Sequence, residues 1–254
     1  MTYLTNLSSE QSRSGLNVAI IGAGGGIGLA LLNHLASQDN VDRLYACSRK
    51  NPEKLHERIE YLNLDLSEEA SIQSAADTVK QQCGQLDVVI VATGILHDAK
   101  NLQPEKSLKQ LDGESFIEVM RVNALGPALV AKYFLPIMNR KNSAFFGALS
   151  ARVGSIGDNG LGGWHSYRSS KAALNMLIKN MAIEYSRRLP ALVIAGLHPG
   201  TVNTSLSKPF QGNVPDGKLF TPEFSASQLL EVINRLKPED SGNCFAWDGQ
   251  RIPA

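Results

Sequence analysis

The chain contains 254 residues, of which 43% are hydrophobic, and its formal net charge at neutral pH is +1. A chain of this length and apolar content can bury one large core without disulfides or a structural metal. The near-neutral balance, with no block of like charges, argues against nucleic acid as a partner.

Cysteine usage and the N-terminal segment favour a cytoplasmic protein. Cys47, Cys83 and Cys244 lie far apart and form neither a metal-ligand pair nor a redox CxxC motif. No apolar run is long enough to span a membrane, and residues 1–15 are polar and Ser-rich, unlike a signal peptide. We therefore expect a loose leader over residues 1–15, one domain over residues 16–254, and no membrane contact.

Short runs of apolar residues, of the length of a strand, alternate with helix-length segments along the whole chain. Seven strands are expected, at Asn17–Ile21, Arg43–Ser48, Arg58–Leu64, Asp87–Ala92, Ala144–Ser150, Leu192–His198 and Cys244–Trp247. Helical spacing occurs at Ile27–Ser37, Glu68–Cys83, Ser115–Met138, Ser170–Leu189 and Ser225–Leu236. This alternation predicts a single α/β domain of the Rossmann type, with a doubly wound, mostly parallel sheet and ligands at the carboxyl ends of its strands.

The first expected strand leads through a glycine-rich turn, residues 22–28, into the first helix. Glycine permits positive φ and lets a phosphate approach the backbone, and the free amides of a helix N-terminus favour an anion. The turn therefore predicts binding of a dinucleotide pyrophosphate by Gly22, Gly24, Gly26, Ile27 and Gly28. A turn that is tight for structural reasons alone is the alternative.

The second expected strand ends at Ser48, Arg49 and Lys50, without a carboxylate. An NAD site usually offers a carboxylate to the adenosine ribose at this point. Ser48 can hydrogen-bond there, and the planar guanidinium of Arg49 can pair with a 2′-phosphate. The pattern favours NADP over NAD, although ordinary surface charges at Arg49 and Lys50 would look the same.

Tyr167 and Lys171 are separated by four positions and would share one face of a helix. A phenol has a pKa near ~10, and a neighbouring ammonium favours the phenolate and lowers that pKa. The spacing therefore predicts a Tyr–Lys pair that transfers a proton. Taken alone, the same spacing is common on helix surfaces.

With this pair and the glycine turn in this order, the chain from about Asn17 to its C-terminus resembles the short-chain dehydrogenase/reductase family. The family's Gly-x-x-x-Gly-x-Gly pattern falls on Gly22, Gly26 and Gly28, with Ile21 in place of the Thr that commonly precedes it. The resemblance implies that Tyr167 and Lys171 also contact the cofactor. It implies the same for Asp65, Leu66, Ala92, Thr93, Gly94, Pro199, Gly200, Val202 and Thr204, with Asp65 at the adenine and Thr204 at the carboxamide.

The resemblance also assigns Asn123 as a catalytic residue. Pro127 lacks the amide that would bond the Asn123 carbonyl in a regular helix, so this carbonyl is expected to be free. It could hold a water that relays protons to Lys171, whereas an ordinary proline kink is the alternative.

The catalytic serine is assigned to Ser150, the last residue of the fifth expected strand. A hydroxyl is needed there because the substrate oxygen gains negative charge in the transition state, and a donor placed beside it stabilises that charge. The segment can also be aligned with the family's motif so that Ala151, and not Ser150, stands at the position of the catalytic serine. The segment Ile156–Trp164 is longer than usual and could bring Ser155 inward.

Several sequence segments, including Tyr167–Asn175 and the C-terminal segment that begins at Trp247, resemble the C-factor and sniffer-like carbonyl reductase branch. This resemblance implies an NADP(H)-dependent oxidoreductase that reduces an aldehyde or ketone, or oxidises the alcohol, through Asn123, Ser150, Tyr167 and Lys171. A dinucleotide-dependent signalling or binding protein of the C-factor type is the rival hypothesis, and an epimerase is a weaker one.

Some features allow two interpretations. Trp164 could line the substrate pocket or cap the core, and residues 205–222 could form a mobile substrate lid or an inert loop. No metal is expected, because His165 and His198 have no third ligand nearby. Related enzymes commonly pair through the helices that hold Asn123 and Tyr167, which makes a homodimer the expected assembly.

Overall fold

The structure is a computed structural model that describes residues 4–8, 15–50, 56–98 and 102–254. An eight-stranded sheet forms its centre, with strand order β10-β9-β6-β5-β4-β1-β2-β3. All neighbouring strands run parallel except β9 and β10. The strands are β1 (Leu16–Ile21), β2 (Val41–Ser48), β3 (Ile59–Asn63), β4 (Val88–Val91), β5 (Ala144–Leu149), β6 (Leu192–His198), β9 (Cys244–Ala246) and β10 (Arg251–Ile252). The short β7 (Thr201–Val202) and β8 (Leu219–Phe220) pair separately.

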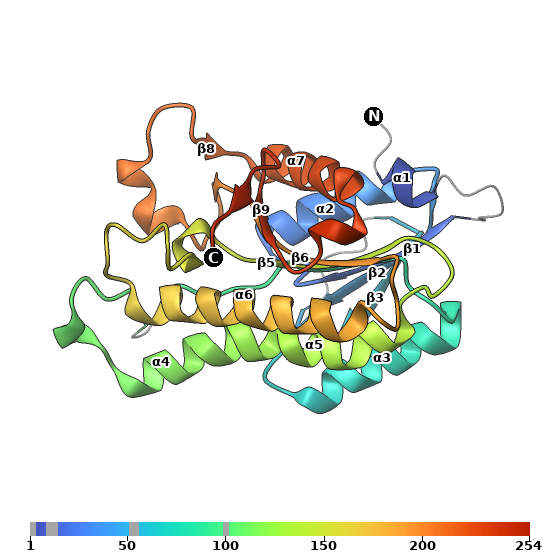
Figure 1. Cartoon of the computed structure of the whole chain (residues 1–254), viewed down its shortest axis with the longest axis horizontal. Helices are drawn as coiled ribbons and strands as arrows, with labels where there is room; N and C mark the ends of the chain where they lie inside the picture. The colour runs from blue at the N-terminus through green and yellow to red at the C-terminus, as the bar shows by residue number, and fades with distance from the viewer. Residues whose placement is uncertain (1–3, 9–14, 51–55, 99–101) are drawn as a thin grey trace.

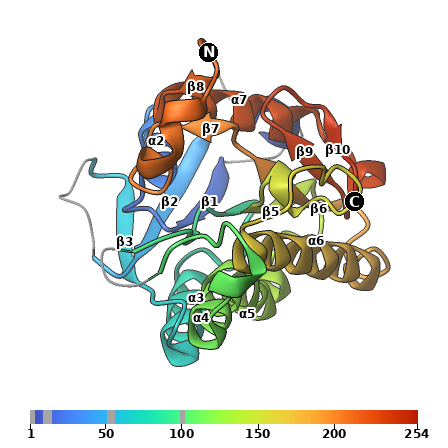
Figure 2. The same cartoon turned by 90° about the vertical axis from the view of Figure 1, so that its left-hand side faces the viewer.

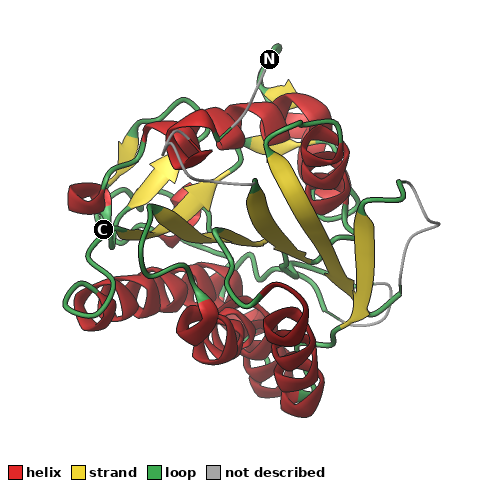
Figure 3. Ribbon diagram, turned by 90° about the vertical axis from the view of Figure 1, so that its right-hand side faces the viewer, coloured by secondary structure: helices red, strands yellow, loops and turns green. Residues whose placement is uncertain are grey.

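Helices cover both faces of the sheet (Figures 1 and 3). One layer holds α1 (Thr5–Ser8), α2 (Gly26–Ala36) and α7 (Pro222–Arg235), and α2 packs directly on α7. The other layer holds α3 (Glu69–Cys83), α4 (Gly113–Met120), α5 (Gly126–Phe134) and α6 (His165–Tyr185). The prediction of a doubly wound α/β sheet is therefore confirmed.

The central strands are apolar on both sides because each side of the sheet has its own core. In β1, Val18 and Ile20 belong to the cluster under α2 and α7, whereas Ala19 and Ile21 belong to the cluster under α3, α5 and α6. This arrangement explains why the parallel strands read as nearly continuous apolar runs rather than as alternating patterns.

The order of the strands creates a switch point between β1 and β4. The chain moves outward from β1 to β2 and β3, then crosses to β4 on the other side of β1 and continues to β5 and β6. The connections that leave β1 and β4 therefore diverge at the carboxyl edge of the sheet. In open α/β sheets this divergence leaves the crevice in which ligands bind.

Three details of the predicted elements differ from the structure. The sheet has an eighth strand, because the two-residue β10 is too short to give a sequence pattern. The expected helix Ser115–Met138 is divided into α4, a π-helical turn and α5. The helix expected at Ser170–Leu189 begins at His165, because its first turn is polar and is fixed by contacts with another loop.

The N-terminal segment is not loose where the structure describes it. Residues Thr5–Ser8 form α1, which packs against α7, and Leu4 and Leu7 are buried. Asn6 donates a hydrogen bond from Nδ2 to the Asn234 carbonyl oxygen at 2.7 Å. Two apolar side chains in a polar segment are a weak sequence signal, and their burial depends on the position of α7.

None of the helices in the described parts of the chain combines the length and apolar character that a membrane crossing requires.

Candidate active site

The glycine turn after β1 and the turn after β4 touch each other at the switch point. Gly22 has a φ of +88°, and a Cβ there would lie 2.7 Å from Thr93 Cγ2 and 2.9 Å from the Ala92 carbonyl oxygen. A Cβ on Gly28 would collide with the Gly22 carbonyl oxygen. A side chain at Gly22 would therefore force the two turns apart, and one at Gly28 would disrupt the glycine turn itself.

A third turn, after β6, closes the crevice from the other side. A Cβ on Gly26 would lie 2.8 Å from Thr204 Cγ2, so Thr204 stands beside the first turn of α2. Gly200 has a φ of +78°, and a Cβ there would lie 2.6 Å from the Phe220 ring. The Pro199 carbonyl oxygen accepts a hydrogen bond from Ser225 Oγ at 2.8 Å, which fixes the turn to α7.

The end of β2 supplies the residues expected at the adenosine end of a dinucleotide. Arg49 and Lys50 are exposed, whereas Ser48 is buried and donates its hydroxyl to the Lys50 carbonyl oxygen at 2.7 Å. Asp65 accepts hydrogen bonds from the amide and hydroxyl of Ser67, which hold the pKa of its carboxyl below the usual value, and the Arg49 charge adds to this effect. Leu66 packs next to Gly126, where a Cβ would lie 2.9 Å from Leu66 Cδ1.

Asn123 lies in the π-helical turn Arg121–Leu125 that precedes Pro127. Its side chain is fully buried and bridges the backbone of Ile95: Oδ1 accepts from the Ile95 amide, and Nδ2 donates to the Ile95 carbonyl oxygen, both at 2.8 Å. Because a π turn adds a residue to the helix, it rotates Asn123 relative to a regular helix, and such turns are frequent at functional sites. The irregularity before Pro127 is therefore a π turn rather than a simple proline kink.

Tyr167 and Lys171 lie in the first two turns of α6 and face the interior. Lys171 is 2% exposed and donates from Nζ to the Leu149 carbonyl oxygen at 2.7 Å. Its Nζ lies 5.7 Å from the centroid of the Tyr167 ring. A Cβ on Gly94 would lie 3.6 Å from Lys171 Nζ and 3.5 Å from Asn123 Oδ1. The structure thus brings the turn after β4 together with Asn123 and Lys171.

Burial sets the protonation of this pair in a way that the sequence did not predict. Desolvation raises the pKa of Tyr167 to about 12 and lowers the pKa of Lys171 to about 8. The expected lowering of the Tyr167 pKa by Lys171 is therefore wrong for this structure, because burial dominates and Nζ is bonded to a backbone carbonyl. At neutral pH Tyr167 holds its proton, as a proton donor must.

Both candidate serines are engaged by other groups. Ser150 is 3% exposed and donates from Oγ to Asn175 Oδ1 at 2.6 Å, beside the Cys244 thiol. Ser155 is 2% exposed, and its Oγ accepts from the Asp158 amide at 3.0 Å. Ser150 follows β5 directly and is adjacent to Ala151. Because both hydroxyls are already engaged, either one must exchange a partner before it can donate to a substrate.

Aromatic side chains form a wall beside Tyr167. The Trp164 ring lies edge-to-face with Tyr167, with centroids 6.2 Å apart, and with Phe210, with centroids 5.2 Å apart. His97 completes the wall at 5.7 Å from Phe210. Trp164 therefore lies against the Tyr167 ring. Phe210 belongs to the expected lid segment, residues 205–222. Figure 2 faces the end of the molecule at which this segment, α4 and the start of α6 lie.

Three further residues support the site but were not singled out from the sequence. Asn175 follows Tyr167 and Lys171 at the same spacing of four, which is a helical stripe that could have identified it. Ser170 is fully buried, donates to the Tyr167 carbonyl oxygen at 2.7 Å and accepts from Asn123 Nδ2 at 3.1 Å. Glu105 contacts the first turn of α6 from a loop 61 residues away, which no local pattern shows.

The crevice fits a dinucleotide. The lack of a side chain at Gly22 and Gly26 lets the turns after β4 and β6 approach the glycine turn closely. The Thr93 hydroxyl is buried with no hydrogen-bond partner among the described residues. An unsatisfied buried hydroxyl is costly, and a polar ligand in the crevice would provide its partner. The exposed amides at the start of α2 favour an anionic group at the glycine turn.

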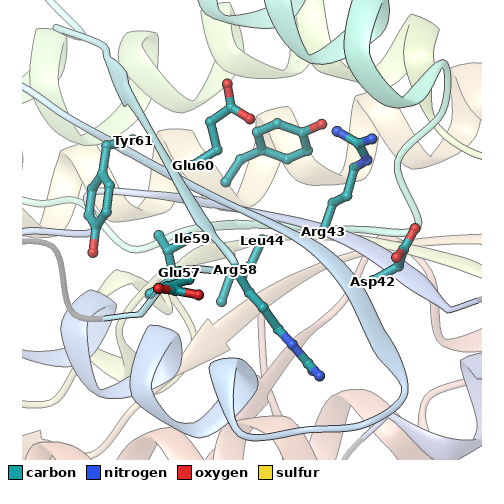
Figure 4. A pocket seen from close by; sticks show the side chains of 9 residues that line it. Asp42, Arg43, Leu44, Glu57, Arg58, Ile59, Glu60 and Tyr61 are labelled. Atoms are coloured by element: carbon teal, nitrogen blue, oxygen red, sulfur yellow. The ribbon is translucent and has the colours of Figure 1, made fainter.

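A separate hollow of about 490 Å³ lies on the edge of the sheet, away from these residues (Figure 4). Its lining comes from β2, β3 and the residues just before β3, with side chains of both charges, and includes neither Tyr167 nor the glycine turn. Within the described residues no group of three or more His, Cys, Asp and Glu side chains is arranged to hold a metal ion.

The comparison with known families identifies the class of protein. The profile of the short chain dehydrogenase family matches residues 16–214, which include the glycine turn, Asn123, Tyr167 and Lys171. The chain therefore belongs to the short-chain dehydrogenase family and is an oxidoreductase of that family.

Individual relatives place the chain near the expected branch. It is 29% identical over 253 residues to an uncharacterised oxidoreductase of Schizosaccharomyces pombe, covering 92% of this chain and 96% of the relative. It is 34% identical over 147 residues to the C-signal protein of Myxococcus xanthus, covering 58% of this chain and 83% of the relative. The expected resemblance to the C-factor type is confirmed.

Two solved structures share the fold. The NADPH-bound carbonyl reductase from chicken fatty liver superimposes with a TM-score of 0.80 at 26% identity, covering 94% of this chain and 99% of that one. The carbonyl reductase Sniffer of Drosophila melanogaster superimposes with a TM-score of 0.82 at 21% identity, covering 94% and 100%. The fold is that of the carbonyl reductase branch.

His198, at the end of β6, is largely buried and is kept neutral by its surroundings. Desolvation lowers its pKa to about 4, and the nearby Arg152 charge acts in the same direction. Its Nδ1 has no hydrogen-bond partner among the described residues. The folded protein therefore keeps His198 neutral between about pH 4 and pH 6.5, a range in which the unfolded chain binds a proton at this position.

Because the unfolded state binds more protons in this range, stability is lost as pH falls from 6.5 to 4. Replacing His198 with Asn should reduce this loss by about 3 kcal/mol, the equivalent of the pKa difference. Urea unfolding of the parent and of His198→Asn at several pH values measures it. The matched variant His56→Asn, at an exposed histidine, should follow the parent. Parallel curves for the parent and His198→Asn would contradict the assignment.

Proposed function

We propose that the protein reduces an aldehyde or ketone with NADPH as the hydride donor. The observation that carries this proposal is the buried Tyr167, protonated at neutral pH and adjacent to Lys171 at the switch-point crevice. A proton donor is what carbonyl reduction requires, since the substrate oxygen becomes an alcohol. NADPH, when bound, supplies the hydride; the protein supplies the proton and the geometry.

In this proposal Tyr167 donates its hydroxyl proton to the substrate oxygen. Lys171 has a pKa of about 8 and is mostly protonated at neutral pH, so its ammonium stabilises the phenolate that forms. Asn123 fixes the loop after β4 through Ile95, next to Lys171. Ser150 polarises the substrate oxygen after it gives up its bond to Asn175.

Cofactor preference is assigned to the end of β2. Arg49 is exposed at the rim of the crevice, and its charge acts on Asp65 from the next strand. A guanidinium at this place can pair with the 2′-phosphate that distinguishes NADP from NAD. Ser48 is close by, although its hydroxyl is donated to the Lys50 carbonyl oxygen. We therefore propose NADPH as the preferred cofactor and NADH as the weaker one.

The aromatic wall supports a substrate with a flat apolar group. Trp164, Phe210 and His97 meet edge-to-face beside the Tyr167 ring and are partly exposed. Aromatic faces and edges of this kind attract planar apolar groups. The substrate class proposed is a carbonyl compound with an aromatic or other apolar substituent next to the carbonyl carbon.

A second candidate function is a dinucleotide-dependent signalling or binding protein, for which the likeness to the C-signal protein is the supporting observation. The two candidates differ in turnover. A panel of aldehydes, ketones and quinones incubated with NADPH, followed by nicotinamide absorbance, supports the reductase if any member is reduced. Tight NADPH binding without turnover supports the binding protein.

The assembly and the location stay predictions. Ile117, Leu125 and Met176 are apolar side chains exposed on the α4–α5 segment and on α6, the helices through which a homodimer was expected. Their exposure supports a dimer, and the proposed cytoplasmic location agrees with the free cysteines Cys47, Cys83 and Cys244.

We expect the parent protein to bind NADPH more tightly than NADH. Arg49→Ala should weaken NADPH binding about tenfold and leave NADH binding nearly unchanged, because one charge-assisted contact to the 2′-phosphate is lost. Ser48→Asp should shift the preference toward NADH by charge repulsion. Titration calorimetry measures the Kd values, with Arg188→Ala, in the exposed turn after α6, as a surface control. Equal Kd values for the two cofactors in the parent would refute the assignment.

Tyr167→Phe should lower the single-turnover rate by about 10²- to 10⁴-fold, because the proton donor is removed while the ring is kept. NADPH affinity should stay within experimental error of the parent. Lys171→Ala should reduce both the rate and the NADPH affinity, since this side chain stabilises the Tyr167 phenolate and is expected to contact the cofactor ribose. Tyr185→Phe, on the same helix, is the control for loss of a phenol. A parental rate in folded Tyr167→Phe would disprove the mechanism.

Substitution of the two serines separates the candidate hydroxyls. Ser150→Ala should lower kcat by about 10²- to 10³-fold if its hydroxyl stabilises the developing oxyanion. Ser155→Ala should change kcat much less, because its hydroxyl supports the Asp158 amide at the surface loop. Steady-state kinetics at saturating NADPH measures both variants. The opposite ranking would assign the role to Ser155.

A further inference from the structure

The segment that enters α6 has an unusual backbone. Three consecutive residues lie in the left-handed region, with φ of +64° at Gly162, +65° at Gly163 and +49° at Trp164. Glycine adopts this conformation freely, but a bulky L side chain is strained there. Leu4 is the one other non-glycine residue with positive φ in the described part of the chain. Surrounding contacts must therefore hold Trp164 in place.

Those contacts come from Glu105, in the loop before α4. The Trp164 amide donates to the Glu105 backbone carbonyl oxygen at 2.6 Å. The Glu105 carboxylate accepts from the Ser166 amide, at 3.2 Å to Oε2, and from the Ser166 hydroxyl. Glu105 is thus bonded to residues on both sides of His165, at the start of α6.

The environment of Glu105 is unusual for a carboxylate. Its side chain is 5% exposed, and Ser166 is 3% exposed. A buried carboxylate is tolerated where hydrogen bonds compensate its desolvation, and the positive end of a helix favours it further. Both conditions are met at the first turn of α6. Ser166 directly precedes Tyr167, so the bonds made by Glu105 act one residue from the proposed proton donor.

We propose that Glu105 is a positioning residue for the catalytic helix. Its backbone carbonyl holds Trp164 in the strained conformation that sets the indole ring against Tyr167 and Phe210. Its carboxylate caps the first turn of α6 and fixes the backbone that carries Tyr167. Glu105 touches neither the substrate nor the reacting atoms in this assignment. The expected effect on substrate turnover rests on the proposed function. The expected effect on the mobility of Trp164 does not depend on it.

The tryptophans of the chain provide a direct measurement of the structural consequence. Trp164 and Trp247 are the two tryptophans in the sequence, so Trp164 is the sole indole reporter in a Trp247→Phe background. Glu105→Ala keeps the backbone carbonyl but removes the carboxylate bonds to Ser166 that fix this loop on α6. The loop and the Trp164 ring should therefore become more mobile, and collisional quenching by acrylamide should rise about twofold. Glu105→Gln should stay near the parent, because its Oε1 can still accept from Ser166. Glu223→Ala removes an exposed first-turn glutamate of α7 and is the matched control.

The kinetic arm uses the parent background and an aromatic ketone with NADPH. Glu105→Ala should raise KM for the ketone about tenfold, the effect of losing hydrogen bonds to a charged group, with NADPH Kd unchanged. Glu105→Gln should restore most of the loss. If Glu105→Ala does not fold, Ser166→Ala carries the test, with a smaller change in the same direction because the amide bond remains.

The outcomes separate this inference from the proposed function. Quenching that rises in Glu105→Ala while the parent shows no turnover supports the positioning role and rejects the reductase. Quenching and KM that match those of Glu223→Ala overturn the positioning role. If Glu105→Ala does not fold, quenching in Ser166→Ala that equals the parent's quenching also overturns the positioning role.

Discussion

The close approach of two backbone turns at the carboxyl ends of β1 and β4 is the constraint on which the site depends. A side chain fits neither at Gly22, where it would meet Thr93, nor at Gly28, where it would meet the Gly22 carbonyl oxygen. Because these turns leave the sheet in opposite directions, the crevice opens between them. The same approach positions the loop after β4, where Gly94 lies next to Asn123 and Lys171. The crevice proposed for the dinucleotide and the Tyr167–Lys171 pair are therefore parts of one packing arrangement.

Burial determines the chemistry available at this edge of the sheet. Tyr167 and Lys171 are both removed from water, which favours the neutral form of each and moves their pKa values in opposite directions. The phenol keeps its proton at neutral pH, and the amine becomes easier to deprotonate. A Tyr–Lys pair in this state is suited to giving a proton to a substrate oxygen. The same desolvation keeps His198 neutral, so low solvent access affects stability as well as catalysis.

The catalytic helix is held from outside its own sequence. Asn123 and Glu105 lie outside α6 and bond Ser170 and Ser166 on it. Asn175 lies on α6 and accepts a hydrogen bond from Ser150 at the end of β5. The aromatic wall joins the start of α6 to the lid segment through Trp164 and Phe210. A change in the loop that holds Glu105 can therefore reach the aromatic wall beside Tyr167 through the backbone of Trp164. Rigid support of this kind is what precise placement of reacting groups requires.

The sequence by itself determined the α/β class, the seven strands shared with the structure and the glycine turn, because each follows from short-range periodicity or spacing. It singled out Tyr167 and Lys171 through their spacing together with the family resemblance of the whole chain. It did not show β10, the π turn at Asn123 or the start of α6 at His165, which depend on partners distant in the chain. The sequence also gave the wrong direction for the Tyr167 pKa, since spacing reveals a neighbouring charge but not the loss of water. The contacts of Ser150 with Asn175 and of Glu105 with Ser166 were decided only by the tertiary structure, because burial and hydrogen-bond partners exist only once the layers have packed together.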